Sequence, residues 1–405
     1  MKIRNKYLVE AIVFMSYVLF AMAWVGGTAS MSQIMSSMQL DSYASASFIS
    51  GAVTFAKIVG TFMAAWLAIK FGVKVAFFIS GLLVVLGIFT PLAQDYEWLL
   101  VSRFLMGLGG ALMIVYFNPI VMNWFSLEER STINGLNAVA FNVGTAIILT
   151  SMVSINELTG NWQNSLVLFS IISLVLIVIW LFVDDQPTTA QTSSQNTVSQ
   201  DSEQTYGYVD GLKDPFNWAY SLCYAGLLAF YICLFTFYPK AGVSESSVVI
   251  GFGIVGTIAG MIYSKRIKQR VSVIKWSGLI VTLMVFTLSF VSSESIQALA
   301  AMVLGFFIFF PITALVSIPH ELPKMTSNKI TVVFSLFWSI SYLFATVVLW
   351  LFGKIVDMNN GDFQYAFGLI AMVSSTLFLG SFFLPETNPK PNKNSISNDS
   401  NEQEA

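Results

Sequence analysis

The sequence has 405 residues, of which 56% are hydrophobic and only 10% charged, and its formal net charge is −2. A water-soluble domain carries about 25% charged residues, because its surface must be polar. The composition therefore excludes an ordinary soluble protein and predicts a chain whose main solvent is lipid. The sequence contains no cluster of basic residues of the kind that binds nucleic acid, so we expect no nucleic-acid partner.

Twelve apolar stretches of the chain are long enough to cross about 30 Å of hydrocarbon as helices. Six come before a polar linker, at residues 8–29, 45–69, 74–93, 98–122, 132–153 and 164–183. Six follow it, at residues 215–238, 246–264, 273–292, 297–317, 330–353 and 364–384. The first stretch has the length of a span, so we interpret it as retained and not as a signal peptide. The pattern predicts an all-α membrane protein with twelve transmembrane helices.

The linker covers residues 184–213 and is rich in Gln, Ser, Thr and Asp, which is typical of a disordered segment. We therefore expect an N-terminal six-helix bundle over residues 1–183 and a C-terminal six-helix bundle over residues 214–385. Residues 386–405 are also polar, and we expect a disordered tail there.

The distribution of Lys and Arg predicts the orientation, because positively charged loops stay in the cytoplasm. On one side of the membrane, alternate loops hold Lys2, Arg4, Lys6, Lys70, Lys74, Arg130, Lys213, Lys265, Arg266, Lys268, Arg270, Lys275, Lys324, Lys329, Lys390 and Lys393. The other side holds only Lys240 and Lys354. We expect both termini to be cytoplasmic and the protein to lie in the plasma membrane, which in a bacterium is the inner membrane.

A short repeat relates the two halves of the chain. Val59-Gly60-Thr61 recurs as Val255-Gly256-Thr257 at the same depth in the second span of the other half. In the same register Lys70 aligns with Arg266, just beyond the end of that span. Such internal symmetry is typical of secondary transporters.

The loop after the second span reads Ala-Trp-Leu-Ala-Ile-Lys-Phe-Gly-Val-Lys over residues 65–74. It resembles the motif Gly-x-x-x-Asp-Arg-x-Gly-Arg-Lys of the major facilitator superfamily. Lys70, Gly72 and Lys74 fit this motif, whereas Ile69 stands at its acidic position, so the charge pairing of that Asp is not carried over. We expect the next loop to replace it, with Glu128 or Glu129 pairing with Lys70 or Lys74. The gating residues that this implies are Lys70, Gly72, Lys74, Glu128, Glu129 and Arg130.

The fourth span begins with Arg103-Phe-Leu-Met-Gly107, which is similar to the Arg-x-x-x-Gly motif of the same family. The stretch from Asn118 to Phe125, with Arg130 and Gly135 beyond it, resembles nitrate/nitrite, cyanate and organic-anion porters. The resemblance extends over nearly the whole chain. It implies two pseudo-symmetric six-helix bundles that work by alternating access around a site at the membrane midplane.

Lys57 is the most informative single residue, because it lies about 20 Å along a helix from the cytoplasmic edge marked by Lys70. A lysine near the midplane costs about 2.5–3.5 kcal/mol to insert. We expect Lys57 to face a central cavity and to bind an anionic group or hold a proton. The alternative is a side chain that snorkels or bonds helix carbonyls. Nitrate/nitrite porters pair such a residue with a second one in span eight, where this chain has Gly253.

Other ionisable residues within the spans are scarce. Arg103 has two open interpretations, a structural residue bonded to backbone or a ligand-binding one. His320 lies at the end of the tenth span, where it either caps the helix or couples transport to protons. No Asp or Glu lies deep in a span, since Glu10 is close to the cytoplasmic end, so we expect no buried titrating carboxylate and no cationic substrate.

Polar and aromatic residues inside spans complete the candidate site. For each one alone, helix packing is also an adequate explanation, but together they predict a cavity that forms hydrogen bonds. With Lys57 and Arg103, the predicted substrate-binding residues are Tyr17, Trp24, Asn118, Asn142, Tyr224, Trp338 and Tyr342.

No metal cluster, P-loop, catalytic triad or dinucleotide fingerprint occurs in the sequence, so we expect no enzyme activity, no cofactor and no metal. The prediction is a monomeric secondary transporter in the lipid bilayer that takes up a small anionic or carboxylate-bearing solute, with a proton or sodium ion as coupling ion. Two alternatives stay open. One is an exporter of drugs or of a metabolite such as a siderophore, and the other is a membrane sensor or scaffold that transports nothing.

Overall fold

The computed structural model describes residues 2–184, 206–266, 269–323, 325 and 327–387. The tail beyond residue 387 and most of the linker, residues 185–205, lie outside the described residues, and so do the predictions made for them. In chain order the helices are α1 (Lys6–Ala29), α2 (Met31–Ser37), α3 (Tyr43–Phe71), α4 (Val73–Val85), the 3-10 helix η1 (Leu86–Phe89), α5 (Tyr96–Trp124), α6 (Leu127–Thr159), α7 (Trp162–Leu181), α8 (Tyr208–Lys213), α9 (Pro215–Thr236), α10 (Ser246–Arg266), α11 (Arg270–Phe290), α12 (Glu294–Phe309), α13 (Ile312–Glu321), α14 (Ser327–Met358), α15 (Gln364–Ser374), α16 (Thr376–Gly380) and η2 (Ser381–Phe383).

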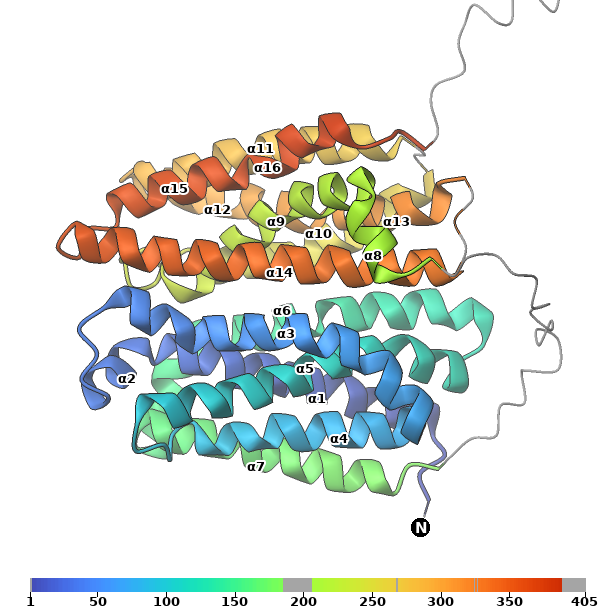
Figure 1. Ribbon diagram of the computed structural model, residues 1–405. Helices are drawn as coiled ribbons and strands as arrows, with labels where there is room; N and C mark the ends of the chain where they lie inside the picture. The colour runs from blue at the N-terminus through green and yellow to red at the C-terminus, as the bar shows by residue number, and fades with distance from the viewer. Residues whose placement is uncertain (1, 185–205, 267–268, 324, 326, 388–405) are drawn as a thin grey trace, which may run out of the picture.

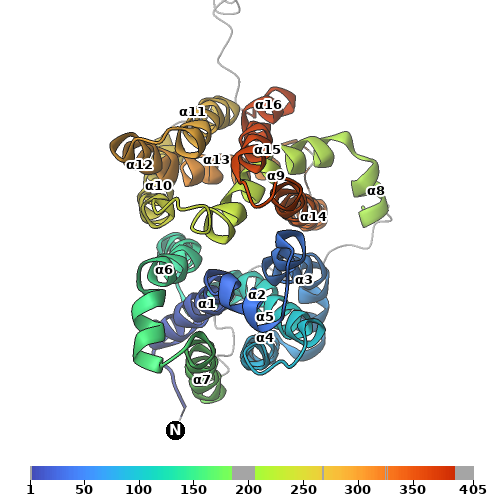
Figure 2. The same ribbon diagram turned by 90° about the vertical axis from the view of Figure 1, so that its left-hand side faces the viewer.

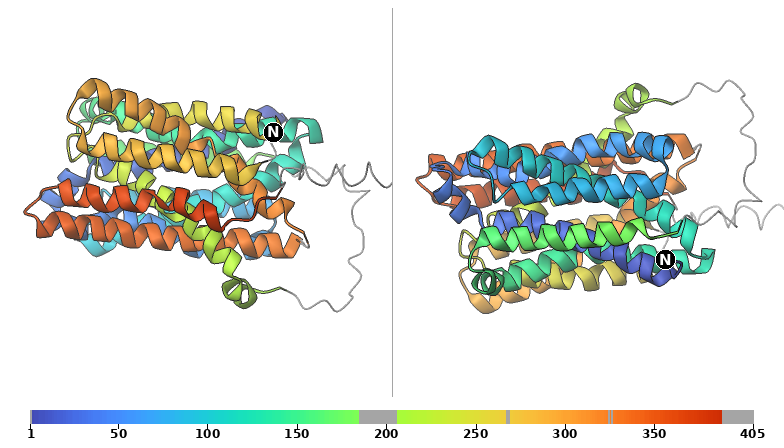
Figure 3. Two further views of the ribbon diagram at one scale, coloured as in Figure 1. Left: turned by 90° about the horizontal axis from the view of Figure 1, so that it is seen from above. Right: turned by 90° about the horizontal axis from the view of Figure 1, so that it is seen from below.

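The long helices run roughly along one axis (Figures 1 and 3), and they form two bundles that lie side by side (Figure 1). Helices α1 to α7 make one bundle and α9 to α16 the other, as the view along the helices shows (Figure 2). The bundles meet mainly where α3 packs on α14 and α6 packs on α10. We call the end that carries Lys6 the terminal end, and the end that carries α2 and the α14–α15 connection the remote end.

The number of spans agrees with the prediction from the sequence. In the described part of the chain, 11 helices are long and apolar enough to cross a membrane, and the shorter apolar helix Val73–Phe89 completes the set. The tenth span is broken at Pro311, which separates α12 from α13, because a proline cannot donate the helical hydrogen bond. The twelve-helix fold in two pseudo-symmetric bundles is confirmed.

The last part of the predicted linker is ordered, which corrects the expectation of disorder up to residue 213. Helix α8 lies against α14, and the Asn217 side chain donates a hydrogen bond of 2.8 Å to the Gly211 carbonyl. The Tyr208 ring also contacts Phe62 of the first bundle edge-on, with 5.0 Å between ring centroids. These contacts depend on tertiary packing, which the polar composition of the segment does not reveal.

The repeated glycines of the two halves occupy equivalent helix crossings. Gly60 lies where α3 crosses α5, and a Cβ atom there would come within 2.6 Å of the Ala111 Cβ. Gly256 lies where α10 crosses α12, and a Cβ atom there would overlap the Phe306 carbonyl oxygen. In lipid, where helices gain little hydrophobic energy by associating, such close approach of backbones is a main source of helix packing.

The close helix crossing at Gly256 can be tested with two variants of α10. Gly256→Ala is expected to destabilise the protein by about 1–3 kcal/mol, because the new methyl group meets backbone that cannot rotate away. Gly251→Ala in the same helix is the matched control, since a Cβ there meets nothing within 4 Å. Thermal unfolding of the detergent-purified variants measures both. Equal melting temperatures for the two would contradict the assignment of Gly256 to a helix crossing.

Candidate functional site

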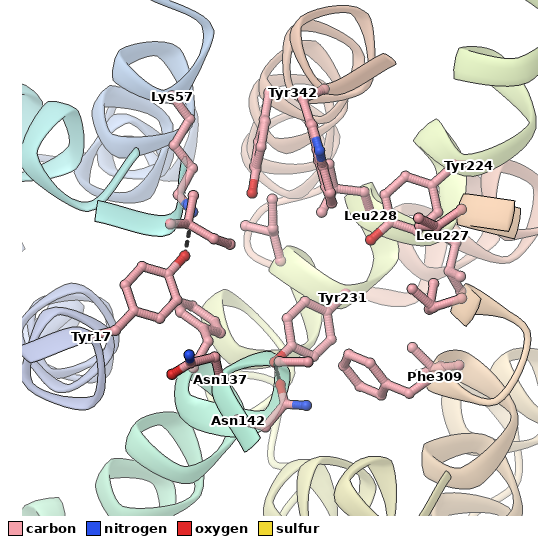
Figure 4. A pocket seen from close by; sticks show the side chains of 18 of the residues that line it. Tyr17, Lys57, Asn137, Asn142, Tyr224, Leu227, Leu228, Tyr231, Phe309 and Tyr342 are labelled. Atoms are coloured by element: carbon pink, nitrogen blue, oxygen red, sulfur yellow. Dashed lines mark hydrogen bonds between the residues drawn. The ribbon is translucent and has the colours of Figure 1, made fainter. Parts of the chain in front are cut away.

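A cavity of about 430 Å³ lies between the two bundles near the middle of the helices. This volume is within the range of small-molecule sites, which are typically about 300–1,000 Å³. Both bundles contribute to its walls (Figure 4). The lining residues are Tyr17, Trp24, Lys57, Ile114, Phe117, Asn118, Asn134, Asn137, Ala138, Phe141, Asn142, Tyr224, Leu227, Leu228, Tyr231, Ile232, Phe235, Ile308, Phe309, Ile312, Val316, Trp338 and Tyr342.

Lys57 supplies a cation to this cavity from α3. Its side chain is 5% exposed, and its Nζ donates a long hydrogen bond of 3.5 Å to the Tyr17 hydroxyl (Figure 4). Among the described residues no carboxylate pairs with it. Aromatic rings take the place of a counter-ion, and their centroids lie 5.0–5.9 Å from Nζ, from Tyr17, Phe20, Trp24, Phe141 and Tyr342.

The aromatic rings stabilise the ammonium group but do not neutralise it. Each cation–π contact contributes about 0.5–2 kcal/mol, depending on how far the groups are desolvated. The rings therefore offset the cost of burial, while the positive charge stays uncompensated inside the cavity. An anion that enters the cavity would meet a strong electrostatic attraction, because the surroundings screen charges poorly.

Amide groups supply the other polar contacts of the cavity. Asn142 of α6 accepts a hydrogen bond of 2.7 Å from the Tyr231 hydroxyl of α9, so this pair joins the two bundles. The amide nitrogen of Asn142 and both amide atoms of Asn137 are buried and have no hydrogen-bond partner. Unpartnered buried amides are rare in folded proteins, and at the wall of a cavity they suit the hydroxyl or carboxylate groups of a ligand.

The structure brings most of the predicted substrate-binding residues into one place. Those that line the cavity are Tyr17, Trp24, Lys57, Asn118, Asn142, Tyr224, Trp338 and Tyr342. Sequence reasoning did not include the neighbouring Asn134 and Ala138 among the site residues. They stand eight and four residues before Asn142, so helical spacing alone could have placed them on the same face.

Arg103 is outside the cavity, which corrects its inclusion in the predicted site. Its guanidinium group is fully buried and donates hydrogen bonds of 2.8–3.0 Å to the carbonyl oxygens of Ala23, Trp24 and Ile49. These contacts tie α5 to α1 and α3. Of the two interpretations left open by the sequence, the structural one describes this arrangement.

Of the two acidic residues predicted to pair with Lys70 or Lys74, Glu129 has a different partner, and the side chain of Glu128 lies outside the described residues. Glu129 pairs with Lys6, at 2.6 and 2.8 Å, and not with Lys70 or Lys74. Hydrogen bonds from Lys6 and Ser126 lower the pKa of the Glu129 carboxyl to about 2. The N-terminus of α1 competes for this carboxylate because α1 packs along α6, a contact between spans that the loop motif does not show.

The other residues of this group have their own contacts. The Lys70 ammonium lies 4.9 Å from the Trp66 ring centroid and 5.2 Å from that of Phe71. Arg130 donates to the carbonyl oxygens of Met122 and Phe125. Gly72 ends α3 with φ +78°, a left-handed conformation that favours glycine. The Lys74 carbonyl accepts from Trp180, and the side chain of Glu128 is outside the described part of the structure.

His320, the predicted proton-coupling residue, is exposed at the terminal end of α13. Its ring contacts that of Phe334, with 5.4 Å between the centroids. It does not line the cavity. This position gives His320 no contact with a ligand in the cavity.

A carboxylate clamp closes the remote end of the molecule. The Asp357 carboxylate of α14 accepts hydrogen bonds from the Ser42 hydroxyl at 2.7 Å and from the backbone amides of Tyr43 and Ala44 at 2.7 and 2.9 Å. These amides are the first donors of α3 and have no helical partner, so an anion at this position is favourable. Gly353 allows the approach, because a Cβ there would meet the Tyr43 backbone at 2.6 Å.

Further contacts between the bundles reinforce this closure. Lys240, just beyond α9, donates a hydrogen bond of 2.9 Å to the Ala29 carbonyl at the end of α1, and burial lowers the pKa of its ammonium group. Nearer the cavity, the hydroxyls of Thr54 and Thr346 are 2.7 Å apart. The described hydrogen bonds between the bundles thus gather at the level of the cavity and toward the remote end.

The clamp can be tested by measuring the separation of the bundles. Spin labels on cysteines introduced at Asp41 and Met358 report the distance between α3 and α14 at the remote end. Asp357→Asn is expected to lengthen and broaden the measured distance distribution, because the amide cannot accept all the hydrogen bonds of the carboxylate. Asp362→Asn is the matched control, since Asp362 accepts from Gln364 only within its own loop. An unchanged distribution in the Asp357 variant would show that the clamp does not hold this end closed.

Residues 13–346 match the model of the Major Facilitator Superfamily. An uncharacterized protein of Campylobacter jejuni, Cj0987c, is 31% identical over 57% of this chain and 69% of its own length. The hexuronate transporter of Bacillus subtilis is 30% identical over 29% of this chain and 28% of its own length.

Solved structures share the fold at low sequence identity. The inward open conformation of the xylose transporter XylE from E. coli is similar with a TM-score of 0.74 and 13% identity, over 95% of this chain and 98% of that chain. A bacterial homolog to the human lysosomal transporter Spinster, in an inward-facing and occupied conformation, is similar with a TM-score of 0.68 and 16% identity, over 95% and 97% of the two chains.

Proposed function

This chain belongs to the Major Facilitator Superfamily, and we propose that it takes up a small carboxylate-bearing solute. Membership of the family makes it a transporter that works by alternating access. The proposal concerns the cargo and the direction. The observation that carries it is the Lys57 ammonium group in the central cavity, which has no carboxylate partner among the described residues.

The charge of the cavity favours an anion over a neutral or cationic solute. Lys57 has no counter-ion among the described residues, and a cationic cargo would add a second positive charge beside it. A carboxylate would accept a charge-assisted hydrogen bond from Nζ, which is stronger than a neutral one. The binding of an anionic cargo thus supplies a charged partner that the described part of the chain does not provide.

The remaining walls suit a hydroxylated molecule of modest size. The amides of Asn137 and Asn142 have free hydrogen-bonding atoms, and the hydroxyls of Tyr17, Tyr224 and Tyr342 come from helices of both bundles. Aromatic faces suit the C–H groups of a sugar ring as well. A hexuronate combines one carboxylate with several hydroxyls, and the likeness to the Bacillus subtilis hexuronate transporter supports this class.

We further propose that both termini are cytoplasmic and that the membrane is the plasma membrane. The excess of Lys and Arg at the terminal end supports this orientation. The clamp at Asp357 then closes the outer side, so the structure represents a cytoplasm-facing state. A proton is the proposed coupling ion, since two of the similar structures are described as proton symporters, for D-xylose and for fucose.

The test compares a carboxylate with its neutral analogue. We expect D-glucuronate to raise the melting temperature of the purified protein, and D-glucose to leave it unchanged, because only the former offers a partner to Lys57. In Lys57→Ala, glucuronate should bind at least about 30-fold more weakly, since removing one member of a buried charge pair costs about 2–5 kcal/mol. Lys354→Ala, at an exposed position far from the cavity, is the control and should bind as the wild type does.

One alternative function has a specific observation in its favour. Most of the cavity wall is apolar or aromatic, which also suits an exporter of drugs or of a metabolite. In that case Lys57→Ala would retain transport, and neutral aromatic compounds would stabilise the protein while organic acids would not. A sensor or scaffold would instead bind a ligand without moving it, so that labelled solute never equilibrates across proteoliposomes.

A further inference from the structure

Helix α8 lies outside the two bundles, beside the seam where α3 packs on α14. It runs across the direction of the spans (Figure 1), and it protrudes from the side of the second bundle (Figure 2). It belongs to the last part of the linker, for which the sequence predicted a disordered cytoplasmic segment. The structure places it against residues that lie within the spans of α3 and α14.

A glycine lets α8 lie directly on α14. A Cβ atom at Gly211 would come within 2.6 Å of the Leu336 side chain and 2.8 Å of the Val332 side chain. The Asn217 amide of α9 donates a hydrogen bond of 2.8 Å to the Gly211 carbonyl. This bond supplies a partner for one of the last carbonyl groups of α8. The helix is therefore fixed to the second bundle through both α14 and α9.

The neighbours of α8 define its depth relative to the spans. The Tyr208 ring meets Phe62 of α3 edge-on, with 5.0 Å between the ring centroids. Phe62 lies eight residues before Lys70, which is about 12 Å along the helix, so this contact is made in the apolar part of α3. Nearer the terminal end, the Lys329 ammonium lies 5.0 Å from the Tyr206 ring centroid. Helix α8 thus lies where charged side chains give way to apolar ones.

The exposed side chains of α8 form an apolar arc and a polar arc. At about 100° per residue, Tyr208, Leu212 and Val209 share one arc of the helix surface, and they are 42%, 45% and 65% exposed. Lys213 and Asp210 are also exposed, and they fall on the adjoining arc. Because Tyr208 points toward the interior of the spans, the apolar arc faces the level of the hydrocarbon and the polar arc faces away from it.

The apolar arc continues a surface that already faces lipid. Phe62 on α3 is 39% exposed and Trp218 in the first turn of α9 is 43% exposed, and both lie within spans. The Trp218 indole donates a hydrogen bond of 2.8 Å to the Leu212 carbonyl at the end of α8. Tryptophan and tyrosine are enriched at the level where headgroups meet acyl chains. This continuity makes the bilayer the natural cover of the apolar arc.

We propose that α8 is an interfacial helix, which lies in the plane of the membrane and has the leaflet at the terminal end as its partner. Val209 and Leu212 insert about 5–10 Å into the boundary between headgroups and acyl chains, and this insertion holds the helix at that depth. Lys213 and Asp210 stay among the headgroups and water. The linker therefore enters the second bundle through the membrane surface. Neither the cargo nor the direction of transport enters into this assignment.

Spin-label accessibility in nanodiscs that hold one protein each tests the assignment. Single cysteines are introduced and labelled, since both native cysteines are buried. In Val209→Cys and Leu212→Cys, the ratio of collisions with oxygen to collisions with a water-soluble nickel complex is expected to be at least about threefold higher than in Lys213→Cys, because oxygen concentrates among acyl chains. Ile171→Cys on the exposed face of α7 calibrates the lipid value, and Asn360→Cys in the α14–α15 turn calibrates the water value.

A substitution within the apolar arc tests whether insertion holds the helix. With the label at Val209→Cys, Leu212→Asp is expected to lower the collision ratio to the value at position 213, because a carboxylate is disfavoured in hydrocarbon. Lys213→Asp is the matched control, since it changes the charge of the polar arc, and it should leave the ratio unchanged. Both positions are exposed, and thermal unfolding confirms that both variants fold. An unchanged ratio in Leu212→Asp would overturn the role of insertion.

Other results would also overturn the proposal. A collision ratio at Val209 as low as that at Asn360 would place α8 in water. Low collision rates with both reagents would show that protein covers the apolar arc, as the rest of the linker could do. Access to water with one copy per disc, together with shielding when several copies share a disc, would make a second copy of the chain the partner.

Discussion

An unpaired ammonium group at the centre of a lipid-embedded protein is the constraint around which this molecule is organised. Lys57 is buried, yet the described structure gives it rings and one tyrosine hydroxyl instead of a carboxylate. Rings lower the cost of the charge without cancelling it. The same aromatic side chains form the wall of the cavity, so the groups that make the folded state tolerable also leave the cation free to attract a ligand. In this protein, stability and recognition depend on one set of contacts.

The interface between the bundles determines from which side of the membrane a solute can reach that cation. Small residues bring helices of one bundle together, as Gly60 and Gly256 do at equivalent crossings. Between the bundles, α3 packs on α14 and α6 on α10, and polar contacts are added to this packing, among them the Asp357 clamp on α3, Lys240 on α1 and the Asn142–Tyr231 bond. Polar contacts between rigid bodies can be exchanged for water or for other partners at modest cost. An interface of this kind suits bundles that must separate at one end and close at the other.

Several features could be predicted because they repeat along the chain or depend on composition. The apolar stretches predicted the spans to within a few residues, and the depth of Lys57 followed from its distance to Lys70 along one helix. The aromatic and amide residues of the cavity followed from polarity inside apolar stretches. Arg103 shows the limit of such reasoning, because a guanidinium bonded to Ala23, Trp24 and Ile49 looks the same in sequence as one that faces a ligand.

The sequence by itself determined that lipid surrounds the chain, how many spans it has, that its two halves are alike and that a lysine lies deep in a span. Each of these features depends on the order of residues along single helices. Only the tertiary structure decided which charges meet. It gave Glu129 to Lys6 and Asp357 to the start of α3, and it left Glu10 buried without a hydrogen-bond partner. The physical reason is that pairing and burial depend on contacts between helices far apart in the chain, and hydropathy carries no record of which helices are neighbours.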